Sequence, residues 1–207
     1  MKAAKNSVNI IKRYNRIAWV YDWIEVPMEM MRFAQWRARF RDHIVGPRIL
    51  EVGVGTGKNF PYYPKDAQVV AIDFSPRMLA KARKRALKQE TKVELHEMDV
   101  QDLKFPDHAF DTIFATFVFC SVPDPVAGLQ ELHRVCKPDG RLILLEHMRP
   151  ANLFMGLFFD LLNPLVVRMV GANINRKTID NIHKAGWHIK IEEHLSSDIV
   201  RWIEAAP

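Results

Sequence analysis

The sequence predicts an α/β fold in which a mainly parallel, seven-stranded sheet carries helices on both faces. Three observations predict it: apolar runs alternate with helical segments from Arg48 onward, a cluster of glycines follows the first run, and 207 residues suffice for one such domain. Hydrophobic residues make up 48% of the chain and charged residues 26%, which favours a folded protein with a core over a disordered one.

Residues 1–47 are predicted to form a basic helical extension in front of the domain at 48–207. Up to Arg48 the chain holds ten Lys or Arg and four Asp or Glu, whereas the remainder holds twenty of each kind. The excess positive charge favours an anionic partner for the extension, lipid headgroups or nucleic acid, although a solvated basic face explains the charge equally well.

Two helices are expected in the extension. The first carries Trp19 and Trp23, whose amphipathic rings favour contact with an anionic membrane surface. Pro27 ends it, and the second helix, 28–43, is expected to pack against the domain. The apolar stripe of the first helix is formed at helical spacing by Ile10, Tyr14, Ile17, Tyr21 and Ile24.

Short apolar runs then predict the strands, at 49–54, 68–74, 93–98, 111–117, 141–146, 188–193 and 199–203. Helices are expected at 76–89, from about 124 to 136 and at 175–185, with a turn at 137–140. Ser75 and Asp124 can cap the first two of these helices, and Gly186 ends the third. Because strands and helices alternate, ligands should bind beyond the carboxyl ends of the strands.

The segment 153–170 is strongly apolar, but it is too interrupted to be predicted as a membrane span. We expect a helix pair or a broken helix within an apolar cap at 148–175, which covers the active site or dips into a membrane interface. The interrupting residues are Asp160, Asn163, Pro164 and Arg168.

Gly53-Val54-Gly55-Thr56-Gly57 directly follows the first predicted strand, and glycines there let the backbone turn sharply and approach a ligand closely. Asp73 ends the second strand, where a carboxylate can accept hydrogen bonds from both hydroxyls of a ribose. A dinucleotide-binding oxidoreductase also has these features, but its fingerprint is GxGxxG, and here the third glycine comes one residue early. Glu51 beside the loop would repel a pyrophosphate and suits an ammonium group.

Five segments in order resemble the motifs of class I methyltransferases that depend on S-adenosylmethionine (SAM) and have a Rossmann-like fold. They lie at 51–57, 73–79, 98–103, 110–113 and 132–140, so the resemblance is continuous from Arg48 to Glu146. It implies SAM as the cofactor and S-adenosylhomocysteine as the product. Val54, between the first two glycines of the loop, departs from the Cys or Ala that relatives often carry.

The resemblance also implies which residues bind the cofactor. The methionine part of SAM would contact the glycine loop, and the ribose would contact Asp73. The adenine would contact Asp99, and residues at the end of the fourth strand would form the floor of the site near the sulfonium. The cofactor-binding residues are then Tyr21, Glu51, Gly53, Gly55, Thr56, Gly57, Asp73, Phe74, Ser75, Met78, Asp99, Val100, Thr116 and Phe117.

Outside this core, the stretch 13–22 is similar to the N-terminal signature of ubiquinone/menaquinone C-methyltransferases and bacterial phospholipid N-methyltransferases. In those families this helix closes over SAM, which implies that Tyr21 touches the cofactor. The catalytic candidates are His147, Tyr14 and Tyr21, because an amine or thiol acceptor must lose a proton. Tyr14, His147, Arg149 and Arg176 are the candidates for substrate binding, with the arginines pairing with a phosphate. A structural histidine and solvated arginines are the alternatives.

We therefore expect a methyltransferase that acts on a membrane-associated acceptor, with the headgroup nitrogen of phosphatidylethanolamine as first choice. A quinone-precursor carbon and a small thiol remain open, as do a nucleic-acid methyltransferase and a SAM-binding protein without catalysis. Nucleic acid is disfavoured because no RNA-binding module is recognisable. Cys120 and Cys136 have no metal-binding spacing, so we expect no metal and a buried, inert Cys120. With no secretory signal visible, the expected location is cytoplasmic, on the inner face of the membrane.

Overall fold

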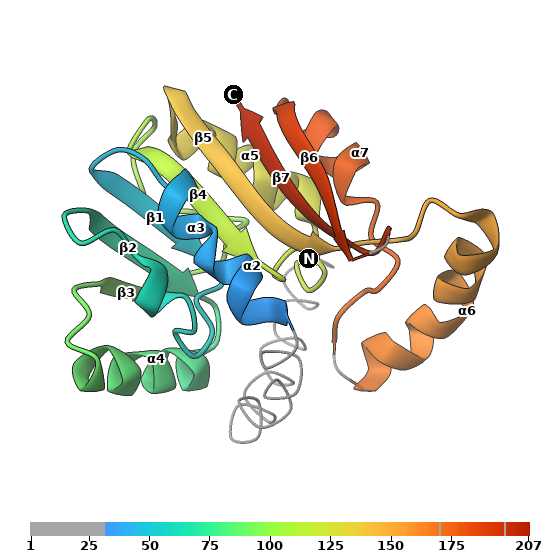
Figure 1. The fold of residues 1–207 in the computed structure, drawn as a ribbon, viewed down its shortest axis with the longest axis horizontal. Coiled ribbons are helices and arrows are strands. Elements are labelled where there is room, and N and C mark those ends of the chain that lie inside the picture. Colours follow the sequence, from blue (N-terminus) through green and yellow to red (C-terminus); the bar gives the residue numbers. More distant parts are fainter. Residues whose placement is uncertain (1–31, 170, 197) are drawn as a thin grey trace.

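The computed structural model describes residues 32–169, 171–196 and 198–207. Its centre is a seven-stranded sheet in the order β3-β2-β1-β4-β5-β7-β6 (Figure 1). The strands are β1 (Arg48–Val52), β2 (Gln68–Asp73), β3 (Glu94–Glu97), β4 (Phe110–Thr116), β5 (Cys136–His147), β6 (His188–Ser196) and β7 (Val200–Ala206). Strands β1 to β5 pair in parallel, and β7 lies antiparallel between β5 and β6. This confirms the predicted mainly parallel α/β sheet, whose strand order reverses between β1 and β4.

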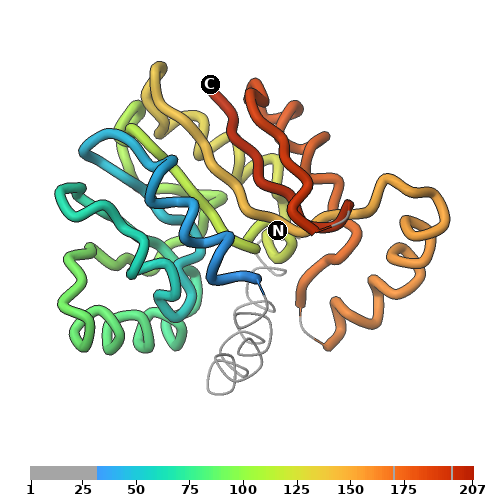
Figure 2. The backbone as a smooth tube through the Cα atoms, viewed as in Figure 1, coloured from blue at the N-terminus to red at the C-terminus, as the bar shows by residue number. Residues whose placement is uncertain are grey.

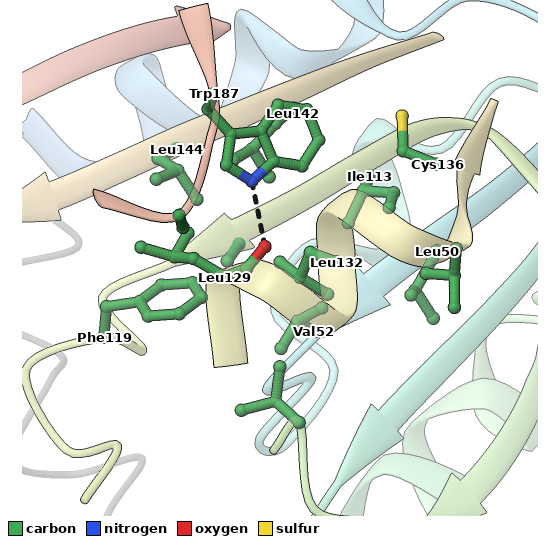
Figure 3. Close-up of a cluster of buried hydrophobic side chains, with 14 of the residues drawn as sticks. Leu50, Val52, Ile113, Phe119, Leu129, Leu132, Cys136, Leu142, Leu144 and Trp187 are labelled. Carbon is green, nitrogen blue, oxygen red and sulfur yellow. Dashed lines mark hydrogen bonds between the residues drawn. The ribbon is translucent and has the colours of Figure 1, made fainter. Parts of the chain in front are cut away.

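Helices cover both faces of the sheet. On one face α5 packs over Leu50 and Val52 of β1, and Ile182 of α7 belongs to the same cluster. The indole nitrogen of Trp187 donates to the Leu129 carbonyl at 2.9 Å (Figure 3). On the other face α3 packs through Phe40, and α4 covers Ala71 of β2. The helices are α2 (Ala34–Ala38), α3 (Phe40–His43), α4 (Pro76–Lys88), α5 (Pro125–Val135), α6 (Leu153–Met169) and α7 (Thr178–Lys184), with a short 3₁₀ helix η2 (Phe60–Tyr62).

The two predicted helix caps are confirmed. The Ser75 hydroxyl accepts a hydrogen bond from the Met78 N–H at 3.3 Å, and the Asp124 carboxylate accepts one from the Ala127 N–H at 3.1 Å. Proline occupies the first turn of both helices, where no N–H is needed. Both α4 and α5 thus begin at the carboxyl edge of the sheet, next to the loops after β2 and β4.

Four predicted boundaries are wrong by three residues or more, and two of them are the carboxyl ends of β6 and β7, each three residues later than expected. The turn expected at 137–140 lies inside β5, because Cys136 pairs with Phe110 and Arg141 with Thr112, so the residues between them form an irregularity of the ladder. The third helix begins at Thr178 instead of 175, after an irregular stretch whose Arg176 carbonyl accepts from the Arg149 N–H at 2.9 Å.

The apolar segment after β5 also differs from expectation. It forms one helix, α6, with Pro164 inside it, and not a helix pair or a broken helix. A proline removes one backbone hydrogen bond, which a 17-residue helix with many others can tolerate. The predicted second helix of the extension is present in its described part as α2 and α3, with only Arg39 between them. No helix in the described ranges is both long and apolar enough to cross a membrane.

Candidate functional site

The glycine loop lies at the carboxyl end of β1, where the strand order reverses. The backbone at Gly53 and Gly55 has positive φ, +67° and +56°. A Cβ atom at Gly53 would lie 2.4 Å from a methyl carbon of Val118, whereas one at Gly55 would make only an ordinary contact with the Gly53 carbonyl oxygen, at 4.0 Å. The loop therefore needs glycine at 55 for its conformation alone, and at 53 for its conformation and for its close approach to the segment after β4.

Asp73 joins this loop to the end of β2. Its carboxylate accepts hydrogen bonds from the Gly55 N–H at 2.9 Å and from the Ser75 N–H at 2.8 Å. Burial raises the pKa of Asp73 to about 6, although these backbone donors act in the opposite direction. The side chain that the sequence assigned to a ribose thus also holds the glycine loop in place.

A cavity open to solvent, with about 420 Å³ of space, lies between the carboxyl ends of β1, β2, β3 and β4. Predicted cofactor residues in its wall are Gly53, Asp73, Phe74, Asp99 and Val100, joined by Val52, Ile72, Met98, Val118, Ser121, Val122 and Pro123. A second cavity of about 410 Å³ is lined by Gly53, Gly55, Asp73, Phe74, Met78, Thr116, Phe117, Val118 and Ser121. The two cavities share walls, so together they form one trough, from Asp99 at one end to Phe117 at the other.

Four of the predicted cofactor residues within the described part of the chain do not line the trough. Ser75 is the cap of α4, and Thr56 and Gly57 lie in the loop without reaching either cavity wall. Glu51 is fully buried, and burial raises the pKa of its carboxyl to about 7. A carboxylate so far from solvent needs hydrogen-bond donors of its own.

Those donors form a buried network that the sequence did not reveal. The Asn59 side-chain amide donates to Glu51 at 2.6 Å and to the Thr116 hydroxyl at 3.1 Å, and the Tyr63 hydroxyl also donates to Glu51. The buried guanidinium of Arg37 donates to the Asn59 oxygen at 2.8 Å. The network links α2 to the ends of β1 and β4, next to the glycine loop.

Asp99 stands at the other end of the trough, and Gln101 orients it. The Gln101 backbone N–H and side-chain amide both donate to the Asp99 carboxylate, at 3.0 and 2.9 Å. The Gln101 oxygen in turn accepts from the Asp124 N–H at 2.9 Å, at the start of α5. The only sequence signal for this role is the position of Gln101, two residues after the acid.

The segment after β4 is held by Glu146, another residue without a predicted role. Its carboxylate accepts from the N–H groups of Val118 and Phe119, at 2.7 and 3.0 Å. Its other oxygen is buried and has no hydrogen-bond partner among the described residues. Burial raises the pKa of this carboxyl to about 7. The signal in the sequence was an acid at the end of an apolar strand, where a charge requires a reason.

His147 lies near the Phe117 end of the trough, with 6.3 Å between the two ring centroids. Phe117 has positive φ and stacks on Phe33, at 4.7 Å between centroids. The Nδ1 atom of His147 is buried without a hydrogen-bond partner in the described structure. Burial lowers the pKa of His147, which favours the neutral imidazole that accepts a proton.

The two predicted phosphate-binding arginines lie together, beside the trough. Arg149 pairs with Asp160 of α6 at 2.9 Å, and Arg176 donates to the carbonyl of Val122, a trough residue, at 2.6 Å. Both line a further cavity of about 460 Å³ that also holds Lys177 and Arg201. Tyr14 and Tyr21 lie outside the described residues. Over the described ranges, no group of three or more His, Cys, Asp or Glu is placed to hold a metal ion.

Comparisons with known proteins agree with this geometry. The family model described as a methyltransferase domain matches residues 50–144. Demethylmenaquinone methyltransferase of Clavibacter sepedonicus is 30% identical over 211 residues, which cover 98% of this chain and 83% of that protein. The chain therefore belongs to the class I SAM-dependent methyltransferases, and SAM is its cofactor.

Two further comparisons bear on the fold and the acceptor. Phosphatidylethanolamine N-methyltransferase of Cereibacter sphaeroides is 43% identical over 104 residues, and this match spans about half of each protein, 49% of this chain and 51% of the relative. A solved SAM-dependent methyltransferase of Thermotoga maritima, a possible histamine N-methyltransferase, superposes with a TM-score of 0.71 at 21% identity, covering 94% of this chain and 98% of the other. At that identity the likeness concerns the fold alone.

Proposed function

We propose that this methyltransferase acts on the headgroup nitrogen of a phosphatidylethanolamine-type lipid at a membrane surface. The observation that supports this acceptor above all is the 43% identity over 104 residues to a phosphatidylethanolamine N-methyltransferase. The location that follows is the inner face of the membrane, with the basic extension on anionic lipid. In this proposal Tyr14 and Tyr21 of the extension close over the trough.

The trough suits SAM because an acid and apolar walls lie at its Asp99 end and an aromatic floor lies at its Phe117 end. In our proposal Asp99 accepts from the adenine amino group, and Asp73 accepts from the ribose hydroxyls. Glu51 lies outside the trough, so in our proposal it attracts the ammonium of the methionine part from behind the glycine loop without contacting it. When bound, SAM supplies a methyl group activated by a sulfonium for in-line displacement.

The protein's own part in the reaction is to place the acceptor and to take its proton. A protonated amine has no free electron pair, so it must lose a proton before it attacks. We assign this step to His147, whose neutral imidazole lies near Phe117. A headgroup phosphate would then sit in the neighbouring cavity, near Arg149 and Arg176.

Methylation of a quinone-precursor carbon is the second candidate. It is favoured by the alignment to demethylmenaquinone methyltransferase, which spans 98% of this chain. That acceptor is also apolar and membrane-associated, so the same surface would serve it.

Incubation with SAM labelled on the methyl group decides between these acceptors. The enzyme is offered vesicles of phosphatidylethanolamine, vesicles that contain demethylmenaquinone, a small alkyl thiol, and RNA, each separately. We expect label in phosphatidylethanolamine. Label only in the quinone, the thiol or the RNA would overturn the proposed acceptor, and cofactor binding without turnover on any acceptor would indicate a SAM-binding regulator.

A further inference from the structure

Helix α6 has its polarity reversed with respect to an ordinary surface helix. Eight of the eleven large hydrophobic side chains that are exposed in the described residues lie on it. Phe154 and Leu161 are 82% and 77% exposed. The eight exposed side chains are Leu153, Phe154, Met155, Leu157, Phe158, Leu161, Leu165 and Met169. A monomer in water rarely leaves such a continuous apolar patch uncovered.

Two of the three polar side chains of α6, those of Asp160 and Asn163, point the other way, toward its own domain. Asp160 pairs with Arg149 at 2.9 Å and accepts from the Asn175 amide at 3.0 Å. The Asn163 oxygen accepts from the Ile174 N–H at 2.9 Å. These polar contacts attach the helix to the protein alongside its half-buried apolar residues Phe159, Leu162, Val166 and Val167, while eight large apolar side chains face outward. An ordinary amphipathic surface helix turns its apolar side inward.

The position of α6 relates it to the trough. The helix follows β5 after a short connection, and Figures 1 and 2 show it projecting from the rim of the sheet, beyond the carboxyl end of that strand. The trough lies at the carboxyl edge of the same sheet. A flat apolar surface in contact with α6 would therefore lie on the side of the molecule that carries the carboxyl edge of the sheet, from which an acceptor enters the trough.

We propose that α6 docks on a lipid bilayer, lying in the interface with its exposed apolar side chains among the acyl chains. Charge agrees with this occupant, because the exposed face of α6 carries one charged residue, Arg168, and its acid, Asp160, is paired on the inner side. Residues 1–48 add a net charge of +6, which favours anionic lipid. A second copy of this chain would bring an equally cationic extension, which opposes self-association.

This docking extends the proposed function, since it rests on a lipid acceptor and delivers that acceptor directly from the bilayer to the trough. It differs from membrane contact through the N-terminal helix, because it assigns the contact to residues after β5. The test must therefore report on α6 itself, independently of the extension.

A fluorescent probe gives that local readout. Cys120 and Cys136 are both buried, so a cysteine introduced as Leu161→Cys can be labelled selectively with an environment-sensitive dye. Adding vesicles of phosphatidylethanolamine and phosphatidylglycerol should shift its emission to the blue. The matched control is Leu87→Cys on α4, which is similarly exposed at 81% and should show no shift. Absence of a shift at 161, or equal shifts at both positions, would overturn the proposal.

A flotation assay with the same vesicles measures the contribution to binding. Leu161→Asp should weaken binding by on the order of tenfold, because it places a charge among acyl chains, whereas Leu87→Asp should leave it unchanged. If binding is unaltered by Leu161→Asp, or if this change instead converts a dimer to a monomer in sedimentation, then α6 is not a lipid-docking helix. Vesicle binding by α6 without label transfer to the headgroup would retain the docking and refute only the proposed acceptor.

Discussion

The trough and the rim around α6 are built in opposite ways. In the trough, backbone N–H groups and buried carboxylates contact one another at short distances, as at Asp73 and Glu146. At the rim, polar contacts at Asp160 and Asn163 help to hold a helix that leaves eight large apolar side chains exposed. The trough is therefore preorganised for one cofactor, whereas the rim presents an exposed apolar surface of the kind that binds a partner or a membrane.

The largest effect is expected at the glycine loop, where single substitutions test the preorganisation of the trough most directly. Gly53→Ala should lower the free energy of unfolding by roughly 2–5 kcal/mol, since it adds backbone strain at positive φ to a clash with Val118. Gly55→Ala, which has the strain without the clash, should cost only about 1–2 kcal/mol. Chemical denaturation measures both, and calorimetry should show weaker SAM binding by Gly53→Ala.

The control for this prediction is the double change Gly53→Ala with Val118→Ala. Removing the two methyl groups of Val118 should recover the part of the loss due to the clash. If the double variant is no more stable than Gly53→Ala, the close approach of these two residues is not the reason for glycine at 53.

A similar effect is expected from pH at Glu146. Its pKa in the folded protein, about 7, lies above its ordinary value of 4.5, so the protonated form favours folding. This stabilisation is complete below pH 4.5 and is lost as pH rises through about 7. The loss should amount to about 3 kcal/mol in the native protein and be absent in Glu146→Gln, whose amide stays neutral.

Unfolding curves of the two proteins at several pH values between 4.5 and 8 test this. Glu51 and Asp73 also have raised pKa values, but they titrate in both proteins and cancel in the comparison. Parallel stability profiles for the native protein and Glu146→Gln would contradict the assignment.

At the junction of trough and rim, His147→Gln should lower kcat for an amine acceptor by on the order of a hundredfold, because the proton acceptor is removed. SAM affinity should stay within about twofold, since His147 is not in the wall of either trough cavity. The measurement is the initial rate as a function of pH. The part of this pH–rate profile that reports deprotonation of the base should disappear in the variant. An unchanged pH profile would indicate a structural histidine.

The smallest effect is expected at Cys120. Burial raises the pKa of its thiol to about 12, so at neutral pH it is protonated and unreactive. Cys120→Ala should retain activity within about twofold and cost about 1 kcal/mol of stability. Activity that is lost in the variant, or that falls on alkylation of the native protein in step with modification of Cys120, would show that the thiol takes part.

Much of the trough was predictable because the roles of its residues depend on neighbours close in the sequence. Ser75 and Asp124 cap helices through contacts within three residues, and the spacing of the glycine loop distinguishes it from a dinucleotide-binding loop. Asp73 ends β2, Asp99 and Phe117 follow β3 and β4, and the ends of these three strands were located within one residue. Their common position at one sheet edge then follows from the parallel arrangement.

The remainder depended on partners distant in the sequence. Asn59 and Arg37 became part of the site only because α2 and the loop after β1 meet at buried Glu51. The turn predicted at 137–140 became part of β5 because Phe110 and Cys136 pair across the sheet. Neither contact leaves a periodic or spacing signal in the chain.

By itself, the sequence determined the alternation of strands and helices, the helix caps and the glycine loop, since each arises from hydrogen bonds and steric limits among neighbouring residues. Only the tertiary structure decided that Asp160 and Asn163 turn inward while Phe154 and Leu161 face out. The physical reason is that Arg149 and Ile174, which bind those two polar side chains, are brought to α6 by the fold after β5, and their contacts set which side of the helix faces the protein.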